Sequence, residues 1–272
     1  MKVITKIGIF SLILGLILLI SGIVLLEVRG ETLGGFNMGK TTSFTDTLDE
    51  TDIDNIEIDI NFSELIIEKG DAFTLKAENV YEKYASHLTN NGNTAVIKAE
   101  NKMKSMFGLE KSITSSGTYT LTVPEKIYDE INCTLSFCDT NISALKADKM
   151  FIDASFSDID CSTFEVYNNL KLDTSFSDFD ISLENEEIEE VYIDNSFGDF
   201  DFNADIITDF AEIDNSFGDC TISLKEGNYN VISDSSFGDI SSDVSTEFNS
   251  DTKTVNIKVD NSFGSIDITT ER

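Results

Sequence analysis

One short motif recurs along the second half of the chain and constrains its fold more than any other feature. The motif consists of a hydrophobic residue, Asp, a small residue, Ser, Phe, then Gly or Ser, and then usually Asp. Its phenylalanines follow one another at intervals of 20 or 21 residues, with one interval of 26 before the last. A unit this short cannot bury a core alone, so we expect the copies to stack as successive coils. The copies are IDASFSD from Ile152, LDTSFSD from Leu172, IDNSFGD from Ile193 and from Ile213, SDSSFGD from Ser233 and VDNSFGS from Val259.

Hydrophobic and polar residues alternate on both sides of each motif. In one copy Met150, Ile152, Ala154 and Phe156 fall on one face, and the alternation restarts at Ile159 after an odd step. Period-two alternation predicts a half-buried strand, and the odd step predicts a corner at the Gly/Ser–Asp pair. The sequence therefore predicts an all-β fold, a single-stranded, β-helix-like β-solenoid with coils of about 20 residues. In this register the Phe side chains point inward, and we expect their ladder to dominate stability.

The same register places some polar and sulfur-containing residues inside the coils. Asn195, Asn215 and Asn261 share an inward column, in which stacked amides are expected to hydrogen-bond along the stack. No two inward cysteines share a column on adjacent coils, so we expect buried thiols and no stable disulfide. The cysteines are Cys133, Cys161 and Cys220 on inward positions, and Cys138 in place of the corner Gly.

The N-terminal part of the chain has the pattern of a membrane anchor. Residues Ile7–Val28 are mostly apolar and carry one charge, Glu27. The segment is long enough to cross a bilayer and too long for the apolar region of a cleaved signal peptide. Lys2 and Lys6 precede this segment, so the positive-inside rule predicts a cytoplasmic N-terminus and an extracytoplasmic C-terminal domain.

These patterns divide the chain into four parts. We expect a short tail at residues 1–6, a transmembrane helix at 7–28, a linker at 29–50 and the β-solenoid at 51–272. Within the solenoid, residues 51–130 are expected to form irregular, wider coils and residues 131–272 the regular repeats. An independent small sandwich over the less regular residues is the alternative.

The charge balance restricts the partners of the domain. A net charge of −31, from 50 acidic and 19 basic residues, repels nucleic acid and tolerates cations, cationic peptides or a basic protein face. A column of aspartates beside the corner is the candidate Ca²⁺ site, because Ca²⁺ prefers oxygen ligands. The alternative is that each Asp caps backbone N–H groups at its own corner. The candidate residues are Asp158, Asp178, Asp199, Asp219 and Asp239.

Catalysis is not expected from this sequence. The single histidine, His87, lies outside the repeats and is interpreted as a surface residue, so no Ser-His-Asp arrangement forms within them. The carboxylates recur in equivalent surroundings, which does not suit the two different roles that glycoside hydrolysis requires. The sequence indicates no enzyme and no cofactor, with Ca²⁺ as the one candidate ion.

The apolar N-terminus, the strand YTLTVP and the run of IDNSFGD repeats together resemble a bacterial family of β-strand-repeat domains known as putative adhesins. The similarity covers residues 40–272. It implies a solenoid-like, often membrane-attached domain of the cell envelope, and it supplies no catalytic or ligand residues. This chain differs from the family pattern in having Ser at several corner Gly positions and in its many acidic residues.

Three functions follow as expectations. The first is a non-catalytic, single-pass membrane protein that presents its β-solenoid for interaction with a protein, a cell-wall polymer or a second solenoid. The second is a sensor of envelope stress or of cationic peptides, which the acidic surface would capture. The third is a surface scaffold that Ca²⁺ stabilises.

Overall fold

The computed structural model describes residues 40–49, 52–99, 117–225, 227–244 and 253–270. These residues form strands, turns and one 3₁₀ helix, η1 (Glu82–Tyr84), and the all-β prediction is confirmed. Among them, no helix has the length and apolar character needed to cross a bilayer. The predicted transmembrane helix at 7–28 lies outside the described residues.

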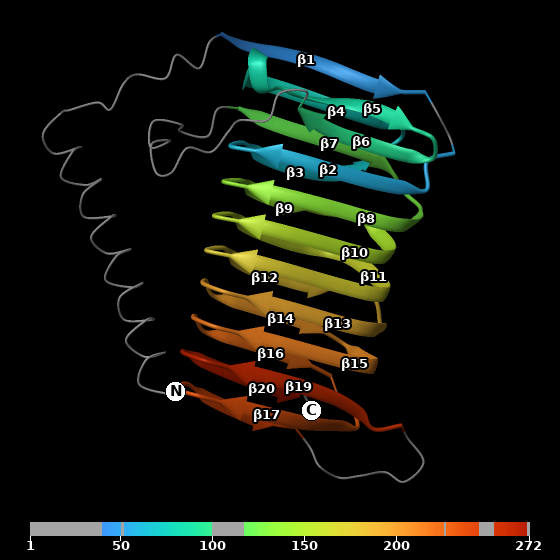
Figure 1. Ribbon diagram of the computed structural model, residues 1–272. Coiled ribbons are helices and arrows are strands. Elements are labelled where there is room, and N and C mark those ends of the chain that lie inside the picture. Colours follow the sequence, from blue (N-terminus) through green and yellow to red (C-terminus); the bar gives the residue numbers. More distant parts are fainter. Residues whose placement is uncertain (1–39, 50–51, 100–116, 226, 245–252, 271–272) are drawn as a thin grey trace, which may run out of the picture. The chain divides into compact units, whose positions relative to one another are not determined.

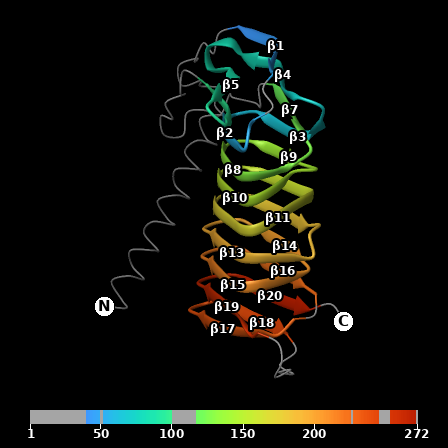
Figure 2. The same ribbon diagram turned by 90° about the vertical axis from the view of Figure 1, so that its right-hand side faces the viewer.

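The strands run in two sheets that face each other across one core (Figures 1 and 2). A typical coil contributes one strand to each sheet, with a corner at the SFGD-type motif between them. In Figure 2 the strands of the first sheet, sheet I, lie towards the left, and those of the second, sheet II, towards the right. Strand β11 is long enough to serve both sheets, pairing with β9 and β12 through its first half and with β10 and β13 through its second.

Sheet I contains ten strands in a continuous hydrogen-bonded series, parallel except for the first pair. In spatial order they are β5 (Ser86–Asn91), β6 (Thr94–Ala99), β2 (Asn55–Asn61), β8 (Ile127–Ser136), β10 (Lys146–Ser155), β11 (Asp158–Ser175), β13 (Glu187–Asn195), β15 (Ile206–Asn215), β19 (Val255–Asn261) and β17 (Tyr229–Ser235).

Sheet II is built in the same way, with antiparallel pairing between its first three strands and parallel pairing beyond them. In spatial order its strands are β1 (Thr41–Leu48), β4 (Phe73–Tyr81), β7 (Thr118–Pro124), β3 (Glu64–Gly70), β9 (Asp139–Ile142), β11, β12 (Asp178–Leu183), β14 (Phe200–Ala204), β16 (Cys220–Leu224), β20 (Ser265–Thr270) and β18 (Asp239–Asp243).

Equivalent positions of the repeats pair directly across neighbouring strands. The hydrophobic residue that opens each motif joins a buried column, and burial of each such side chain contributes about 1.5–3 kcal/mol. The Asp that follows it forms a parallel, exposed column on the outer side of sheet I. The buried column contains Ile152, Leu172, Ile193, Ile213 and Val259.

The inward orientation predicted for the repeat phenylalanines is wrong. Phe156 is 51% exposed and Phe176 is 38% exposed, and each stacks on its neighbour with ring centroids 4.8 Å apart. The rings form one continuous stack along the corner, in parallel contact at 4.5–5.1 Å, and all of them except the buried Phe62 at one end are at least partly exposed. Its members, in spatial order, are Phe62, Phe137, Phe156, Phe176, Phe197, Phe217, Phe263 and Phe237.

The corner takes two forms, and together they explain the outward rings. Where Ser or Cys follows the Phe, the Phe itself has a positive φ, 54° at Phe156 and 57° at Phe176, and the next side chain, such as Ser157, turns inward. At three of the corners where Gly follows, the Gly has the positive φ: 140° at Gly198, 130° at Gly218 and 106° at Gly264. In both forms the strand ends before the Phe, at Ser155 in β10 and at Asn195 in β13, so counting by twos through the corner gives the wrong face.

The spatial order of the coils departs from the chain order at both ends (Figure 1). The β2–β3 coil lies between the later strands β6–β7 and β8–β9. The β19–β20 coil lies between β15–β16 and the earlier β17–β18 coil. Phe263 consequently stacks between Phe217 and Phe237, and the longer interval before Phe263 belongs to the connection that makes this return.

The first strands of the domain also differ from the predicted organisation. Residues Thr41–Leu48, assigned to the linker, form β1, which pairs antiparallel with β4. Within 51–130, the expected wider coils are in part antiparallel strands, namely β4 and the β5–β6 hairpin. The hairpin turns at Gly92, where φ is +69°. Parallel pairing of β2 with β8 and of β3 with β9 joins this region to the repeats, so it is not an independent sandwich.

Candidate binding surfaces

The corner aspartates bind the backbone of the neighbouring coil. The Asp178 Oδ1 atom accepts a hydrogen bond from the Asp199 N–H at 2.9 Å, and Asp199 accepts one from Asp219 at the same distance. Asp219 accepts bonds from the N–H and the hydroxyl of Ser265, at 2.9 and 2.7 Å. Backbone capping was predicted within each Asp's own corner, and for Asp178, Asp199 and Asp219 that detail is wrong, because their bonds run between coils.

These bonds give the column a structural role that requires no ion. The Ser265 hydrogen bonds lower the pKa of Asp219, whereas burial and then the carboxylates of Asp139 and Asp178 raise the pKa of Asp158. Asp239, the remaining candidate, pairs with Ser265 in the last coil. Within the described ranges, no three Asp, Glu, His or Cys side chains gather as a group that could hold a metal. The Ca²⁺ site stays a prediction.

The inward asparagines form the predicted hydrogen-bonded column. Asn195 donates to the Asn215 Oδ1 atom at 2.9 Å, and Asn215 donates to the Asn261 Oδ1 atom at 3.1 Å. Each amide also donates to a corner carbonyl, Asn195 to Gly198 at 2.7 Å. The column therefore holds the Gly corners in register from inside.

The cysteines are buried thiols, as predicted. Desolvation raises the pKa of Cys133 to about 12 and that of Cys138 to about 11, so neither forms a reactive thiolate near neutral pH. Cys138 lies at the corner, where its thiol contacts the Ile60 carbonyl at 3.3 Å.

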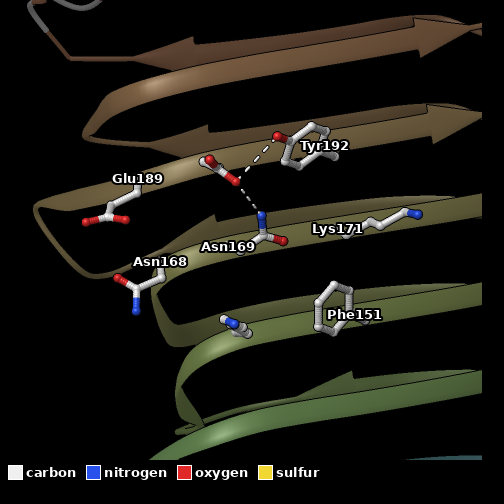
Figure 3. Close-up of a pocket in the computed structure, with 8 residues that line it drawn as sticks. Phe151, Asn168, Asn169, Lys171, Glu189 and Tyr192 are labelled. Atoms are coloured by element: carbon white, nitrogen blue, oxygen red, sulfur yellow. Dashed lines mark hydrogen bonds between the residues drawn. The ribbon is translucent and has the colours of Figure 1, made fainter.

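An open groove of about 610 Å³ lies on the outer face of sheet I (Figure 3). Three neighbouring strands, β10, β11 and β13, supply its lining from outward positions. The side chains combine two aromatic rings, two lysines, two amides and two carboxylates. They are Lys149, Phe151, Asn168, Asn169, Lys171, Glu189, Glu190 and Tyr192.

A β-bulge shapes one side of this groove. Between Ala147 and Lys149 of β10, the pairing with β11 shifts register, and β11 has one more residue than its neighbour. Asn168 and Asn169 belong to this irregular stretch. Bulges redirect side chains and are frequent beside binding sites. Here the bulge directs the two amides to the groove, whereas a regular ladder would have spaced these amides differently.

Hydrogen bonds fix the central groups of the groove. The Glu190 Oε2 atom accepts a bond from the Asn169 amide at 2.9 Å and one from the Tyr192 hydroxyl at 3.4 Å (Figure 3). Burial and the adjacent Glu190 carboxylate raise the pKa of Tyr192, so its hydroxyl stays protonated. Tyr192 also contacts the Phe210 ring, with centroids 5.9 Å apart, which extends the aromatic surface by one coil.

His87 lies at the other end of the domain, where its side chain is half-exposed. Its ring stacks on Phe44 at 4.3 Å, and its Nδ1 atom lies 2.9 Å from the Asp46 Oδ2 atom. The contact ties β5 to β1 and gives the histidine a structural place outside the groove.

The repeats of this chain match those of a known protein family. The sequence pattern of the Toastrack DUF4097 family matches residues 53–194 and, in an overlapping second match, residues 131–271. The chain belongs to this toastrack family. The overlap itself reflects the repeat, since the same coils satisfy either copy of the pattern.

Solved structures with the toastrack chain's fold include a protein of Bacteroides fragilis described as a putative adhesin. It is 14% identical, covers 84% of this chain and 97% of its own, and superposes with a TM-score of 0.50. A protein of Parabacteroides distasonis with the same description is 9% identical, covers 85% and 98%, and gives a TM-score of 0.45. A protein of Clostridium sporogenes described as a putative cell adhesion protein is 11% identical, covers 85% of this chain and 100% of its own, and gives a TM-score of 0.36. At 14% identity the likeness to the Bacteroides fragilis protein shows the fold alone. A search of curated proteins gives no significant match.

The toastrack fold explains why the groove was not predicted. The alternation already places Phe151, Lys171 and Tyr192 on outward positions, where large aromatic residues are unexpected. What brings them together is the pairing of Phe151 with Lys171 and of Lys171 with Tyr192 across three coils. An aromatic residue at an outward position was the available signal.

Proposed function

We propose that this protein is a non-catalytic, membrane-anchored component of the bacterial cell envelope that binds a partner through its extracytoplasmic toastrack domain. The groove on sheet I is the observation that carries the proposal. Exposed aromatic rings beside convergent polar groups are typical of binding surfaces. The coils beneath hold these groups in place, because β10, β11 and β13 are each paired on both sides.

The membrane anchor and orientation rest on the sequence. The apolar segment Ile7–Val28 and the preceding Lys2 and Lys6 support a single-pass anchor with the toastrack domain outside. Membership of the toastrack family and the likeness to a solved protein described as a putative adhesin support a place in the envelope and a role in contact with other molecules.

The test is made on intact cells that produce the full-length chain with a C-terminal epitope tag. Added protease is expected to remove the tag from intact cells, whereas a cytoplasmic control protein survives until lysis. Purified full-length chain is also expected to sediment with isolated envelope material. A tag protected until lysis, or a chain that stays in the supernatant, would reject the proposal.

Capture of cationic peptides is a second candidate function, favoured by the exposed aspartate columns. Burial first, and then the carboxylate of Asp173, raises the pKa of both Asp153 and Asp194, as expected of repelling charges that a bound cation would relieve. Binding of a lysine-rich peptide that weakens steeply as NaCl is added would support this function. Equal binding of a neutral peptide of the same length would count against it.

A further inference from the structure

Lys149 and Lys171 differ from the other lysines of the regular coils. Neither forms an ion pair with any residue that the structure describes, although the chain carries a net charge of −31. Both face the groove on sheet I. The remaining described lysines after Ile127 each pair with a carboxylate, and they are Lys146, Lys225, Lys253 and Lys258. Lys171 acts electrostatically on Asp194, partly offsetting the rise that burial and Asp173 cause in its pKa, without forming a salt bridge with it. Two lysines without a salt bridge leave the groove able to accept one anionic group.

The aromatic residues of the groove supply a complementary apolar surface. Phe151 and Tyr192 are half-exposed and lie on either side of Lys171 in the same outward column. Sheet positions like these present rings that can contact the apolar face of a ligand ring while polar groups surround its edge.

The remaining polar groups provide donors and acceptors side by side. Asn168 and Asn169 offer amide N–H and C=O groups, and Glu189 and Glu190 offer carboxylate oxygens. The Asn169–Glu190 bond of 2.9 Å holds one donor and one acceptor at a fixed separation. Vicinal hydroxyls, each both donor and acceptor, match such a set better than an acidic side chain of a peptide does.

The backbone around the groove also disfavours an extended peptide. Peptides often add to a sheet through a free strand edge. Here β10 pairs with β8 and β11, while β13 pairs with β11 and β15, so none of the three strands has a free edge.

We propose that the groove binds a sugar residue carrying a single anionic group, a carboxylate or a phosphate, with the lysines on the anion and Phe151 or Tyr192 under the ring. A single anionic group is specified because the acidic columns beside the groove, Asp153 and Asp173 among them, repel an extended polyanion. This inference rests on the proposed binding function and names its ligand class. The ligand contacts one subsite about three coils wide.

The experiment measures binding of small probes to purified full-length chain in detergent, by saturation-transfer NMR and by calorimetry. A disaccharide with one glucuronic acid tests the carboxylate, glucose 6-phosphate tests the phosphate, and cellobiose is the uncharged control. At least one charged probe is expected to bind about tenfold more tightly than cellobiose, a difference that shrinks as NaCl is added. The stronger charged probe identifies which anion the groove takes.

Variants locate the site. K149Q/K171Q is expected to remove the preference for the charged probe, and Y192A to weaken all three probes, while K225Q and K253Q, which change exposed lysines elsewhere, leave binding unchanged. Thermal unfolding checks that each variant is folded, since the altered lysines are exposed. Equal binding of charged and neutral probes, no effect of K149Q/K171Q, or preferred binding of an acidic peptide would overturn the inference. These results do not depend on where the domain lies in the cell, so the protease experiment judges the proposed function separately.

Discussion

The side-chain amide of Asn215 lies between those of Asn195 and Asn261 and is bonded to both, accepting from the first at 2.9 Å and donating to the second at 3.1 Å. It also donates to the Gly218 carbonyl at 2.9 Å. One buried polar side chain thus connects three coils and a corner.

We expect Asn215→Ala to destabilise the domain by about 2–3 kcal/mol, because it leaves buried partners of the amide unsatisfied. Asn203→Ala, which removes a half-exposed amide bonded to Ser182 at 3.3 Å, is the matched control and should cost under about 1 kcal/mol. Urea unfolding of both variants measures the difference. Equal losses would show that the column contributes nothing beyond an ordinary surface bond.

Gly218→Ala should be among the most damaging corner substitutions. A Cβ atom there would lie 1.9 Å from the Gly198 carbonyl oxygen, at a φ of +130°. Relief requires neighbouring coils to separate, and we expect a loss above about 3 kcal/mol. Gly92→Ala is the control, since its φ is +69° and no atom lies within 4 Å of the new methyl group. It should cost about 1 kcal/mol. A Gly218 variant as stable as the Gly92 variant would contradict the corner geometry.

The outward ring stack makes the phenylalanines unequal. Phe164 is fully buried, so Phe164→Ala should cost about 3–5 kcal/mol through the cavity it leaves. Phe156 is 51% exposed between two stacked rings, and Phe156→Ala should cost about 1–2 kcal/mol, mostly from lost ring contacts. Chemical unfolding of the two variants decides the matter. A larger loss of unfolding free energy for Phe156→Ala than for Phe164→Ala would mean that the motif Phe points inward after all.

Acid should at first stabilise the domain. Burial first, and then the neighbouring carboxylates, raise the folded-state pKa of Asp153, Asp194 and Asp214 above the unfolded value of 3.8. The folded state therefore binds protons before the unfolded state does, and stability rises as pH falls from 7 through these raised values towards 3.8. Below that, Asp219, whose pKa the Ser265 bonds lower, loses its contribution as it is protonated.

Thermal midpoints measured from pH 7 to pH 3 at constant ionic strength test this curve. We expect a maximum on the acidic side of neutrality, and Asp194→Asn should raise the midpoint at pH 7 and flatten the rise. A midpoint that falls steadily from pH 7 would mean that the column carries no net repulsion.

The corner aspartates lead to a prediction about calcium. Because Asp178, Asp199 and Asp219 already accept backbone bonds, we expect CaCl₂ to raise the thermal midpoint no more than MgCl₂ or NaCl at matched ionic strength. EDTA should leave the midpoint unchanged. A saturable rise specific to Ca²⁺, lost in Asp199→Asn, would instead establish the column as a metal site.

The parts of the fold that sequence could predict are those governed by regular alternation. Ile193 and Asn195 lie on uninterrupted strands, so counting by twos placed both correctly inside. Phe197 comes two residues after Asn195, yet the corner begins between them, and backbone dihedrals there depend on whether Gly or Ser follows. The sequence did contain a sign of two corner types. Repeats with Asn two residues before the Phe have Gly directly after it, whereas those with Ala154 or Thr174 at that position have Ser after the Phe.

The order of the coils could not be predicted, because coils of similar sequence can form the same parallel pairing with a given neighbour. Val259 and Ser233 occupy the same position of the repeat, and either could pair with Ile213. The structure places Val259 there and leaves Ser233 exposed in the outermost coil. Serines at inward positions are what an end coil requires, since its open side meets water, and this polar substitution was the sign of an end.

The return of β19 and β20 into the stack has a consequence for how the domain is made. Residues 229–243 leave the ribosome before residues 255–270, yet they occupy the position beyond them. In the folded domain β17 pairs with β19 and β18 pairs with β20, and the structure describes no other strand partner for either. A chain that stops before residue 255 therefore lacks both strands that join β17 and β18 to the rest of the stack.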